Sequence, residues 1–194
     1  MSEKELIIKL RQQTGAGIMD IKEALQESGV DEAKAIEFLR KKGQKIAAKR
    51  AERQAGEGWI GSYVHSNGKV AGFVSLKCET DFVARNAEFQ ALAHDLAMHA
   101  VASNPIYLKP EDVPAEIIEK EKEIYKAEAA QAGKTGDMVD KIIEGKLSKF
   151  YSDVCFLKQP YFKDDAKTVQ TLLDEATGKI GEKIEIGEFK RVQI

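Results

Sequence analysis

Apolar residues recur every three to four positions along the first 54 residues, the period of helices with one buried face. Leu6 and Leu10 share such a face, and Ser2 and Glu5 form a capping box that marks a helix start. The second and third runs follow short breaks and carry Ile18, Ile21, Leu25, Ala35, Ile36 and Leu39. The pattern predicts three short helices in a bundle of about 40 residues, which is marginal as an independent domain.

After about residue 55 the pattern changes to strands and longer helices. Residues 59–65 and 70–78 are rich in β-branched and aromatic residues, and the Asn67-Gly68 pair between them is a strong hairpin signal. Residues 183–192 alternate loosely and predict a last strand. Helices are predicted at 86–103, at 115–130, from near Asp137 through Phe150, and at 167–176. The fold class is therefore α+β, a helical appendage followed by an antiparallel sheet with helices packed on it.

Composition indicates a folded protein with nearly balanced charge. Of its 194 residues 43% are apolar and 32% are charged, and the formal net charge is -2. That balance excludes a chain-wide basic surface for nucleic acid. No run of about 18 apolar residues exists, and the first ten residues lack the apolar core of a signal peptide. We therefore expect a cytoplasmic protein with no membrane partner.

Residues 40–53 depart from this balance, with seven Lys or Arg against the single acid Glu52. Such a stretch could bind RNA, but it lacks the interleaved aromatic residues on which bases stack. A charged helix is more often a solvated face. An RNA-associated module that uses residues 40–53 is therefore kept as the alternative function.

Glycine and histidine patterns do not indicate a phosphate or metal site. Residues 15–17 (Gly-Ala-Gly) lack the lysine and hydroxyl of a phosphate-binding loop and are interpreted as a turn between helices. His94 and His99 are five positions apart and do not share a helix face. With His65 they show no metal-ligand spacing, so we expect neither a metal nor a cofactor.

The two cysteines, Cys78 and Cys155, are too few for a disulfide scaffold. Either could act as a nucleophile beside a histidine, although buried inert thiols fit the pattern better. We expect no catalytic group, and a small cysteine enzyme is the third functional hypothesis.

The segment from Glu79 to Arg85 joins the second predicted strand to a helix. Thr80 or Asp81 suits the N-cap of that helix, and Phe82 could then pack into the core as a staple. Alternatively, Phe82 lies exposed at the loop tip and forgoes about 1.5–3 kcal/mol of burial that a partner's pocket could restore. The residues alone leave both interpretations open.

The same segment resembles the Thr-Asp-Phe-Val motif of the bacterial elongation factor Ts family, the nucleotide exchange factors for elongation factor Tu. Other motifs of that family occur in order along nearly the whole chain, and their combination is far more specific than any one of them. They are Leu10-Arg11, Thr14-Gly15-Ala16-Gly17, Met19-Asp20, Lys22, Ala24-Leu25, Gly61 to His65, Ala97 to Ala102, Pro105, Lys109 to Val113, Glu144 to Leu147, Lys149-Phe150 and Gln159-Pro160-Tyr161. The chain is similar to the short form of the family, in which these segments share one core.

The resemblance implies a different function for each of the two predicted parts of the chain. In the family the N-terminal helices form a module similar to ubiquitin-associated domains, which docks on the GTP-binding domain of elongation factor Tu. Residues 1–54 would be this three-helix docking module with a basic linker, and residues 55–194 the α+β core for dimerisation and exchange. The docking residues are implied to be Gly15, Ala16, Gly17, Ile18 and Met19.

The resemblance also implies the exchange mechanism. Thr80, Asp81, Phe82 and Val83 would contact the partner, and the Asp-Phe pair would enter between helices near the nucleotide, where it disturbs magnesium and phosphate contacts until GDP leaves. His65 would contact the partner as well. A homodimer is expected to compensate for the single core of the short form, and no direct contact with nucleic acid is implied.

Overall fold

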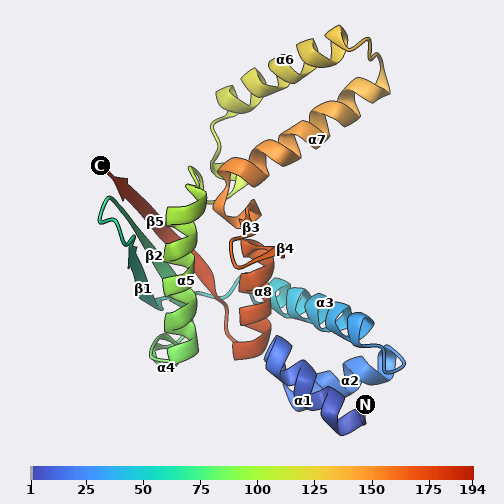
Figure 1. The fold of residues 1–194 in the computed structure, drawn as a ribbon, viewed down its shortest axis with the longest axis vertical. Helices are drawn as coiled ribbons and strands as arrows, with labels where there is room; N and C mark the ends of the chain where they lie inside the picture. Colours follow the sequence, from blue (N-terminus) through green and yellow to red (C-terminus); the bar gives the residue numbers. More distant parts are fainter. Residues whose placement is uncertain (1) are drawn as a thin grey trace. The chain divides into compact units, whose positions relative to one another are not determined.

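The computed structural model describes residues 2–194 and confirms the α+β class (Figure 1). The chain divides into two compact units. The first consists of the described part of Met1–Gly61 with Ser75–His94 and Gln170–Gly187, and the second of Ser62–Val74, Asp95–Val169 and Glu188–Ile194. Three strands and one long helix contribute segments to both units. The division of function between 1–54 and 55–194 stays a prediction.

The three predicted N-terminal helices are confirmed as α1 (Glu3–Thr14), α2 (Ile18–Glu27) and α3 (Glu32–Arg50). The capping box is also present, because the Glu5 amide donates to the Ser2 hydroxyl at 3.3 Å and the Ser2 amide donates to the Glu5 carboxylate at 2.7 Å. The helices bury a small core of their own, formed by Leu6, Leu10, Ile21, Ala24, Leu25 and Ala35. Local periodicity therefore determines this part of the fold.

α3 continues through most of the basic stretch, which is helix rather than linker up to Arg50. Lys, Arg, Gln and Ala are good helix formers, so the composition of this stretch favours that continuation. α3 packs within the first unit against α8 (Val169–Ile180). Arg40 pairs with Glu175 of α8 at 3.2 Å, and a Cβ built at Gly178 would lie 3.0 Å from the Gly43 Cα. The two helices therefore approach closely at Gly43 and Gly178, where a side chain at Gly178 would be tightly packed.

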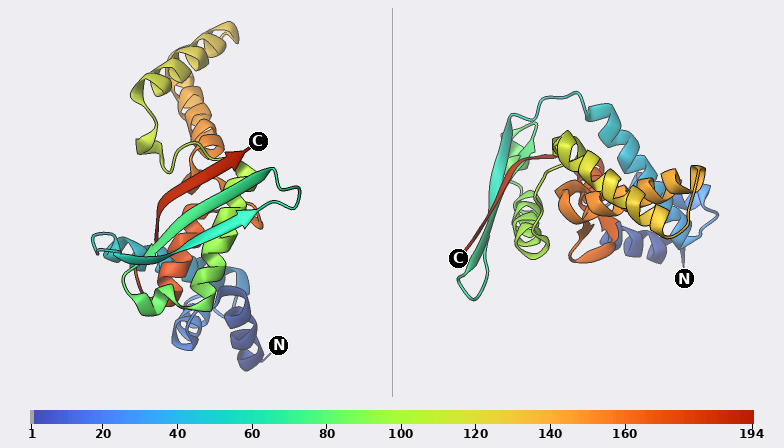
Figure 2. Two further views of the ribbon diagram at one scale, coloured as in Figure 1. Left: turned by 90° about the vertical axis from the view of Figure 1, so that its left-hand side faces the viewer. Right: turned by 90° about the horizontal axis from the view of Figure 1, so that it is seen from above.

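The sheet has three strands, β1 (Glu57–Val64), β2 (Val70–Cys78) and β5 (Glu185–Gln193), in the order β1-β2-β5. Figure 2 shows β2 between the other two. The turn between β1 and β2 is the predicted one, and the Lys69 amide donates to the Asn67 side-chain oxygen at 2.9 Å. The strands predicted at 59–65, 70–78 and 183–192 are thus confirmed with small shifts at their ends.

α5 (Ala87–Ser103) lies directly on the sheet. A Cβ built at Gly61 would stand 2.0 Å from the Ala93 carbonyl oxygen, and one at Gly72 would stand 2.6 Å from that of Ala97. Since no side chain fits at either position, glycine allows the helix backbone to contact the strands. The predicted apolar face of this helix is confirmed by the burial of Phe89 and Leu96.

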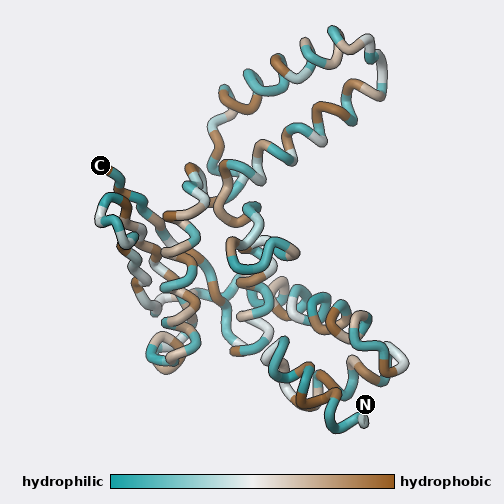
Figure 3. The backbone as a smooth tube through the Cα atoms, in the orientation of Figure 1, coloured by the Kyte–Doolittle hydropathy of each residue, from teal (hydrophilic) through white to brown (hydrophobic). Residues whose placement is uncertain are grey.

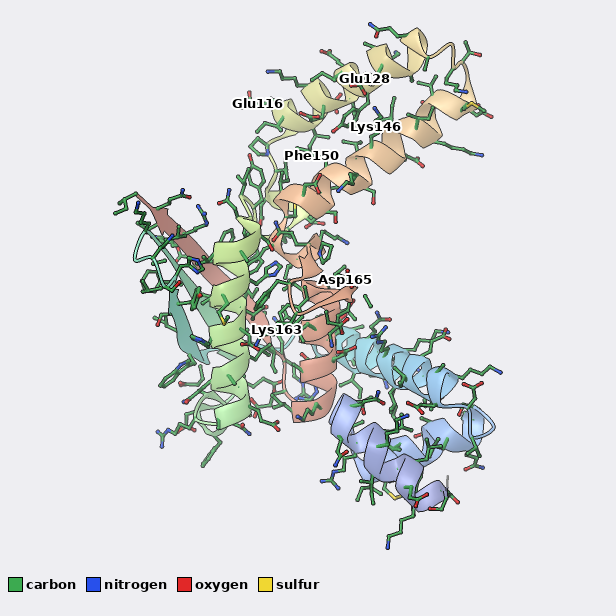
Figure 4. The ribbon with its side chains drawn as sticks, in the orientation of Figure 1. Glu116, Glu128, Lys146, Phe150, Lys163 and Asp165 are labelled. Carbon is green, nitrogen blue, oxygen red and sulfur yellow. The ribbon has the colours of Figure 1, made fainter. Side chains whose placement is uncertain are left out.

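In the second unit α6 (Ala115–Gln131) and α7 (Asp137–Val154) form an antiparallel hairpin. In Figure 3 apolar and polar stretches alternate along both helices. Glu128 and Lys146 form an ion pair across the hairpin, and Figure 4 shows them pointing toward each other from the two helices. The Lys146 ammonium also lies 5.3 Å from the ring centroid of Tyr125. Ala129 is the one fully buried residue of α6, as expected for a helix largely surrounded by solvent.

Several short elements were not predicted. They are the 3-10 turns η1 (Pro110–Asp112) and η2 (Phe156–Lys158), and the antiparallel strands β3 (Pro160–Tyr161) and β4 (Asp164–Thr168). The helix start predicted at Thr80 or Asp81 is confirmed, since Thr80 is the N-cap of α4 (Asp81–Ala84), but that helix is a single turn. β4 displaces the start of the last helix, which was predicted at 167–176 and runs from Val169 to Ile180. Elements this short contain too few positions for a hydrophobic period to appear. Nowhere in residues 2–194 does a helix combine the length and apolar character needed to cross a membrane.

Candidate functional site

The segment after β2 forms the single helical turn α4, with Thr80 in extended conformation before it. We call Thr80–Ala84 the Phe82 turn. The Ala84 amide donates to the Thr80 carbonyl at 3.2 Å, and the Arg85 amide donates to the Asp81 carbonyl at 3.1 Å. A single turn of helix is not stable alone. Contacts from elsewhere in the protein must therefore hold this turn in place.

Phe82 is 82% exposed, whereas Val83 is half-buried and Ala84 is buried. The staple interpretation is therefore wrong, because a staple would bury its ring against the helix. Among the large apolar residues of the described chain, Ile194 alone is more exposed, at 89%. A ring in this position lacks the stabilisation of about 1.5–3 kcal/mol that burial of the side chain would provide. The turn thus displays an apolar side chain to whatever molecule approaches it.

Asp81 and Thr80 make different use of their oxygens. The Asp81 carboxylate accepts from Arg85 Nη2 at 3.0 Å; the Arg85 side chain is largely in solvent and that of Asp81 is about half exposed. Such an exposed pair contributes about 0–1 kcal/mol, so Asp81 can change partners at little cost. Thr80 is the N-cap by position, but its hydroxyl donates to Glu182 Oε1 at 2.7 Å and caps no amide of α4. The expected capping bond is replaced by a contact with a residue that sequence reasoning did not single out.

The Gly15–Met19 turn joins α1 to α2. The Gly15 amide donates to the Arg11 carbonyl at 2.9 Å, and its φ of 65° ends α1 in the left-handed conformation that favours glycine. Beyond it Ile18 is 43% exposed and Met19 is 76% exposed. Ala16 packs on the core of the three helices. The turn therefore presents two apolar side chains on a rigid local support.

Contacts inside the first unit connect the Gly15–Met19 turn to the start of α5. A Cβ built at Gly15 would lie 2.6 Å from Lys179 Cε, so the turn lies against the Lys179 side chain of α8. Lys179 Nζ pairs with the Glu88 carboxylate at 2.8 Å. Glu88 lies in the first turn of α5, six positions after Phe82 in the sequence. The structure thus places both apolar features in one unit.

His65 belongs to the second unit and follows the end of β1. Its ring is exposed, and its Nδ1 lies 3.1 Å from the Tyr63 hydroxyl. With Tyr63 it borders an apolar depression of about 280 Å³, which is further lined by Val70, Met98, Val101, Ala102 and Phe162. An imidazole at the edge of such a depression could bind a partner, but no carboxylate or second histidine lines the depression with it.

His94 is exposed, whereas His99 and the two cysteines are buried. His99 stacks on Phe156 at 5.2 Å and has its Nε2 3.0 Å from Gln159 Oε1, and burial lowers its pKa. Burial raises the pKa of the Cys78 thiol, as does the nearby charge of Glu182, and it raises the pKa of Cys155 to about 11. Both thiols therefore stay protonated near neutral pH. Among residues 2–194 no cluster of three or more potential metal ligands is present.

Most basic residues of the 40–53 stretch face carboxylates within the first unit. Five of the seven are paired: Arg40 with Glu175, Lys41 with Glu37, Lys42 with Asp20 and Glu23, and both Arg50 and Arg53 with Glu79. Their charge is thus largely compensated by the protein itself. A phosphate backbone would have to compete with these carboxylates.

Comparison with known proteins gives consistent matches over nearly the whole chain. Residues 5–194 match the sequence model of the family described as Elongation factor TS. Elongation factor Ts of Geobacter metallireducens is 52% identical over 183 residues, which cover 94% of this chain and 85% of that protein. Elongation factor Ts of Maridesulfovibrio salexigens is 48% identical over 190 residues, with coverages of 98% and 92%. That of Oleidesulfovibrio alaskensis is 48% identical over 189 residues, with coverages of 97% and 96%.

Proposed function

The chain belongs to the elongation factor Ts family of translation elongation factors, and we propose on this premise that it binds elongation factor Tu in its GDP form and promotes GDP release. The observation that carries the proposal is the exposure of Phe82, at 82%, within the Thr-Asp-Phe-Val motif. An aromatic ring displayed on a short turn is suited to enter a pocket of a partner. Its burial there would return about 1.5–3 kcal/mol to the complex.

The exchange follows from competition between two ligands of one partner. Magnesium is the largest local charge at a bound nucleotide, so a small displacement of its ligands weakens nucleotide binding strongly. If the Phe82 turn fits only when those ligands have moved, the factor and GDP oppose each other's binding by the same ratio. Partner contacts then supply the energy for release, and no catalytic group is needed. Asp81 can leave Arg85 at little cost and bind the partner instead, because that pair is exposed.

The Gly15–Met19 turn is proposed as the docking site, within a docking module of residues 1–54. Ile18 and Met19 are exposed beside a core that holds their helix rigid, so little entropy is lost when a partner covers them. Lys179 and Glu88 support the combination of this turn and the Phe82 turn in one binding surface.

Residues 55–194 are proposed as the core for dimerisation and exchange. His65 would make a second partner contact from the second unit. A homodimer is supported by the exposure of Val64 on β1 and Phe73 on β2, at 61% and 43%, which a second copy could cover. We place the protein in the cytoplasm, where translation elongation takes place.

Two observations disfavour the alternatives. Five of the seven basic residues at 40–53 are paired with carboxylates, which leaves little charge for RNA. Cys78 and Cys155 are fully buried and their pKa values are raised, which disfavours a cysteine nucleophile. An RNA-associated module would show binding that falls steeply with rising salt.

The proposal is tested by stopped-flow measurement of fluorescent GDP release from elongation factor Tu. The wild-type chain should accelerate release, and Phe82→Ala should abolish most of the acceleration while leaving thermal unfolding unchanged. Ile194→Ala is the matched control, because it removes another highly exposed apolar side chain outside the proposed site. Absence of acceleration by the wild-type chain would contradict the proposed function. Acceleration that survives Phe82→Ala would support the function but contradict the proposed role of the Phe82 ring.

A further inference from the structure

The carboxylate of Glu182 holds the base of the Phe82 turn. Glu182 Oε2 accepts from the Glu79 amide at 3.1 Å and from the Thr80 amide at 3.0 Å. Glu182 Oε1 accepts from the Thr80 hydroxyl at 2.7 Å. Three donors of the segment that leads into α4 thus converge on one charged side chain. Hydrogen bonds to an ionised acceptor are about twice as strong as neutral ones.

Glu79 makes the reverse contact. Its Oε1 accepts from the Lys183 amide at 2.6 Å, so two neighbouring loops exchange carboxylates for backbone amides. We call this pair of contacts, between residues 79–80 and residues 182–183, the glutamate clasp. The Glu79 carboxylate also accepts from Arg50 Nη1 at 3.0 Å and from Arg53 Nη1 at 3.1 Å. The clasp therefore reaches the end of α3 as well as the start of β5.

The loop that carries Glu182 is itself fixed. The Gly181 amide donates to the Thr177 carbonyl at 2.9 Å, and a φ of 81° at Gly181 ends α8. The Ile184 amide donates to the Thr177 hydroxyl at 3.2 Å, and both residues are buried. Glu182 is therefore presented from a rigid support, which is what a positioning contact requires.

We propose that Glu182 is a positioning residue for nucleotide exchange, which fixes the direction of Phe82 through Thr80, and that Glu79 ties this position to the end of α3. The proposal rests on the proposed function of the Phe82 turn. Ala84 is buried at the end of this one-turn helix, but the ring of Phe82 is too exposed for apolar packing to fix its direction. Without the clasp the turn could move by about an ångström, and a displacement of that size can cost about a hundredfold in rate.

The first test compares Glu182→Ala with a matched control, Glu185→Gln. Glu185→Gln also removes one negative charge, three positions further along the chain. The Glu185 carboxylate contacts Lys183 Nζ at 2.9 Å. Glu182→Ala should lower the maximal rate of stimulated GDP release by about tenfold to a hundredfold. Glu185→Gln should stay within about twofold of the wild type, since it leaves the contacts of residues 79–80 in place. A wild-type rate for Glu182→Ala would overturn the proposal.

A double-mutant cycle separates positioning from general support of the fold. If Glu182 acts through Phe82, Glu182→Ala should cause no further loss of exchange in a Phe82→Ala background. An equal loss in both backgrounds would show that Glu182 acts by another route. Should Glu182→Ala unfold the chain, Glu182→Gln keeps the size and one acceptor oxygen and should give a smaller loss with the same dependence on Phe82.

Amide hydrogen exchange, measured by NMR on the chain alone, keeps the inference separate from the proposed function. Glu182→Ala should speed exchange at the amides of Glu79 and Thr80, while Glu185→Gln should not. Unchanged protection of both amides in Glu182→Ala would contradict the claim that Glu182 holds residues 79–80 in place. The wild-type chain could fail to accelerate GDP release from elongation factor Tu while Glu182→Ala still lowers the protection of these two amides. In that case the proposed function and the role of Glu182 in exchange are both wrong, and only the structural contact remains.

Discussion

The Gly15–Met19 turn and the Phe82 turn both expose apolar side chains, yet they are held in place in different ways. Beneath the first lie Leu10 and Leu25, within about ten positions of Met19 and fully or almost fully buried. The second is a single helical turn whose base is held by Glu182, 102 positions after Thr80. One turn is supported by its own neighbours in sequence, and the other by a distant carboxylate.

This difference fits a division of labour in which the Gly15–Met19 turn docks the protein on its partner and the Phe82 turn releases GDP. A docking surface needs a rigid local support that keeps its apolar residues exposed, because preformed surfaces lose less entropy on binding. A side chain that must enter a partner at one point needs its direction fixed as well, and a hydrogen-bonded clasp supplies direction better than apolar packing, which is not directional. Substitutions beneath the first turn should therefore affect stability, and substitutions around the second should affect rate.

The largest expected effect is on the local support of the Gly15–Met19 turn. Leu10→Ala should lower the free energy of unfolding by about 2–5 kcal/mol, because Leu10 is fully buried and a cavity would remain. Denaturant unfolding followed by circular dichroism measures the loss. Phe82→Ala is the counterpart at the other turn and should change stability by less than about 0.5 kcal/mol. A loss below about 1 kcal/mol for Leu10→Ala would mean that the small core does not carry the turn.

A moderate effect is expected on affinity at the docking turn. Met19→Ala should raise the concentration of factor needed for half-maximal GDP release by about tenfold, a typical cost for a central interface residue. The maximal rate should not change, since Met19 is proposed to bind and not to displace the nucleotide. Met138→Ala on α7 is the control, because it also replaces a methionine that is more than half exposed. A reduced maximal rate for Met19→Ala would place this turn in the exchange step itself.

The smallest effect is a pH dependence of the clasp. The Lys183 amide, with the guanidinium groups of Arg53 and Arg50, holds the pKa of the Glu79 carboxyl below its ordinary value. A carboxyl with a lowered folded-state pKa adds stability above its unfolded value, about 4.3, and that stability is lost as pH falls through the folded-state pKa. The stability advantage of the wild type over Glu79→Gln should thus shrink as pH falls from about 5 to about 3. A constant difference across that range would contradict the contacts of Glu79.

The parts of the fold that could be predicted are those whose signals are local. The capping box at Ser2 and Glu5 and the turn at Asn67-Gly68 each involve residues within a few positions of one another. The helical period over α1 to α3 likewise requires no knowledge of the rest of the chain. The family motifs added the location of the candidate site, which composition and spacing alone left undecided.

What could not be predicted depends on contacts distant in sequence. β3 and β4 have two and five residues, too few for a strand pattern. The exposure of Phe82 was undecided, because a polar residue before an apolar one fits a buried staple as well as a free tip. Glu182 carries no local signal at all, since its role arises only where the loop after α8 meets the end of β2.

The most direct test of this division of labour is a pair of full saturation curves for stimulated GDP release, one for Phe82→Ala and one for Met19→Ala, each beside the wild type. Phe82→Ala should lower the maximal rate by about a hundredfold, the size expected of a dominant interface residue. Met19→Ala should reach the wild-type maximum at a higher concentration. If Phe82→Ala instead reached the wild-type maximum and only shifted the curve, the Phe82 turn would be a second docking contact and not the element that releases GDP.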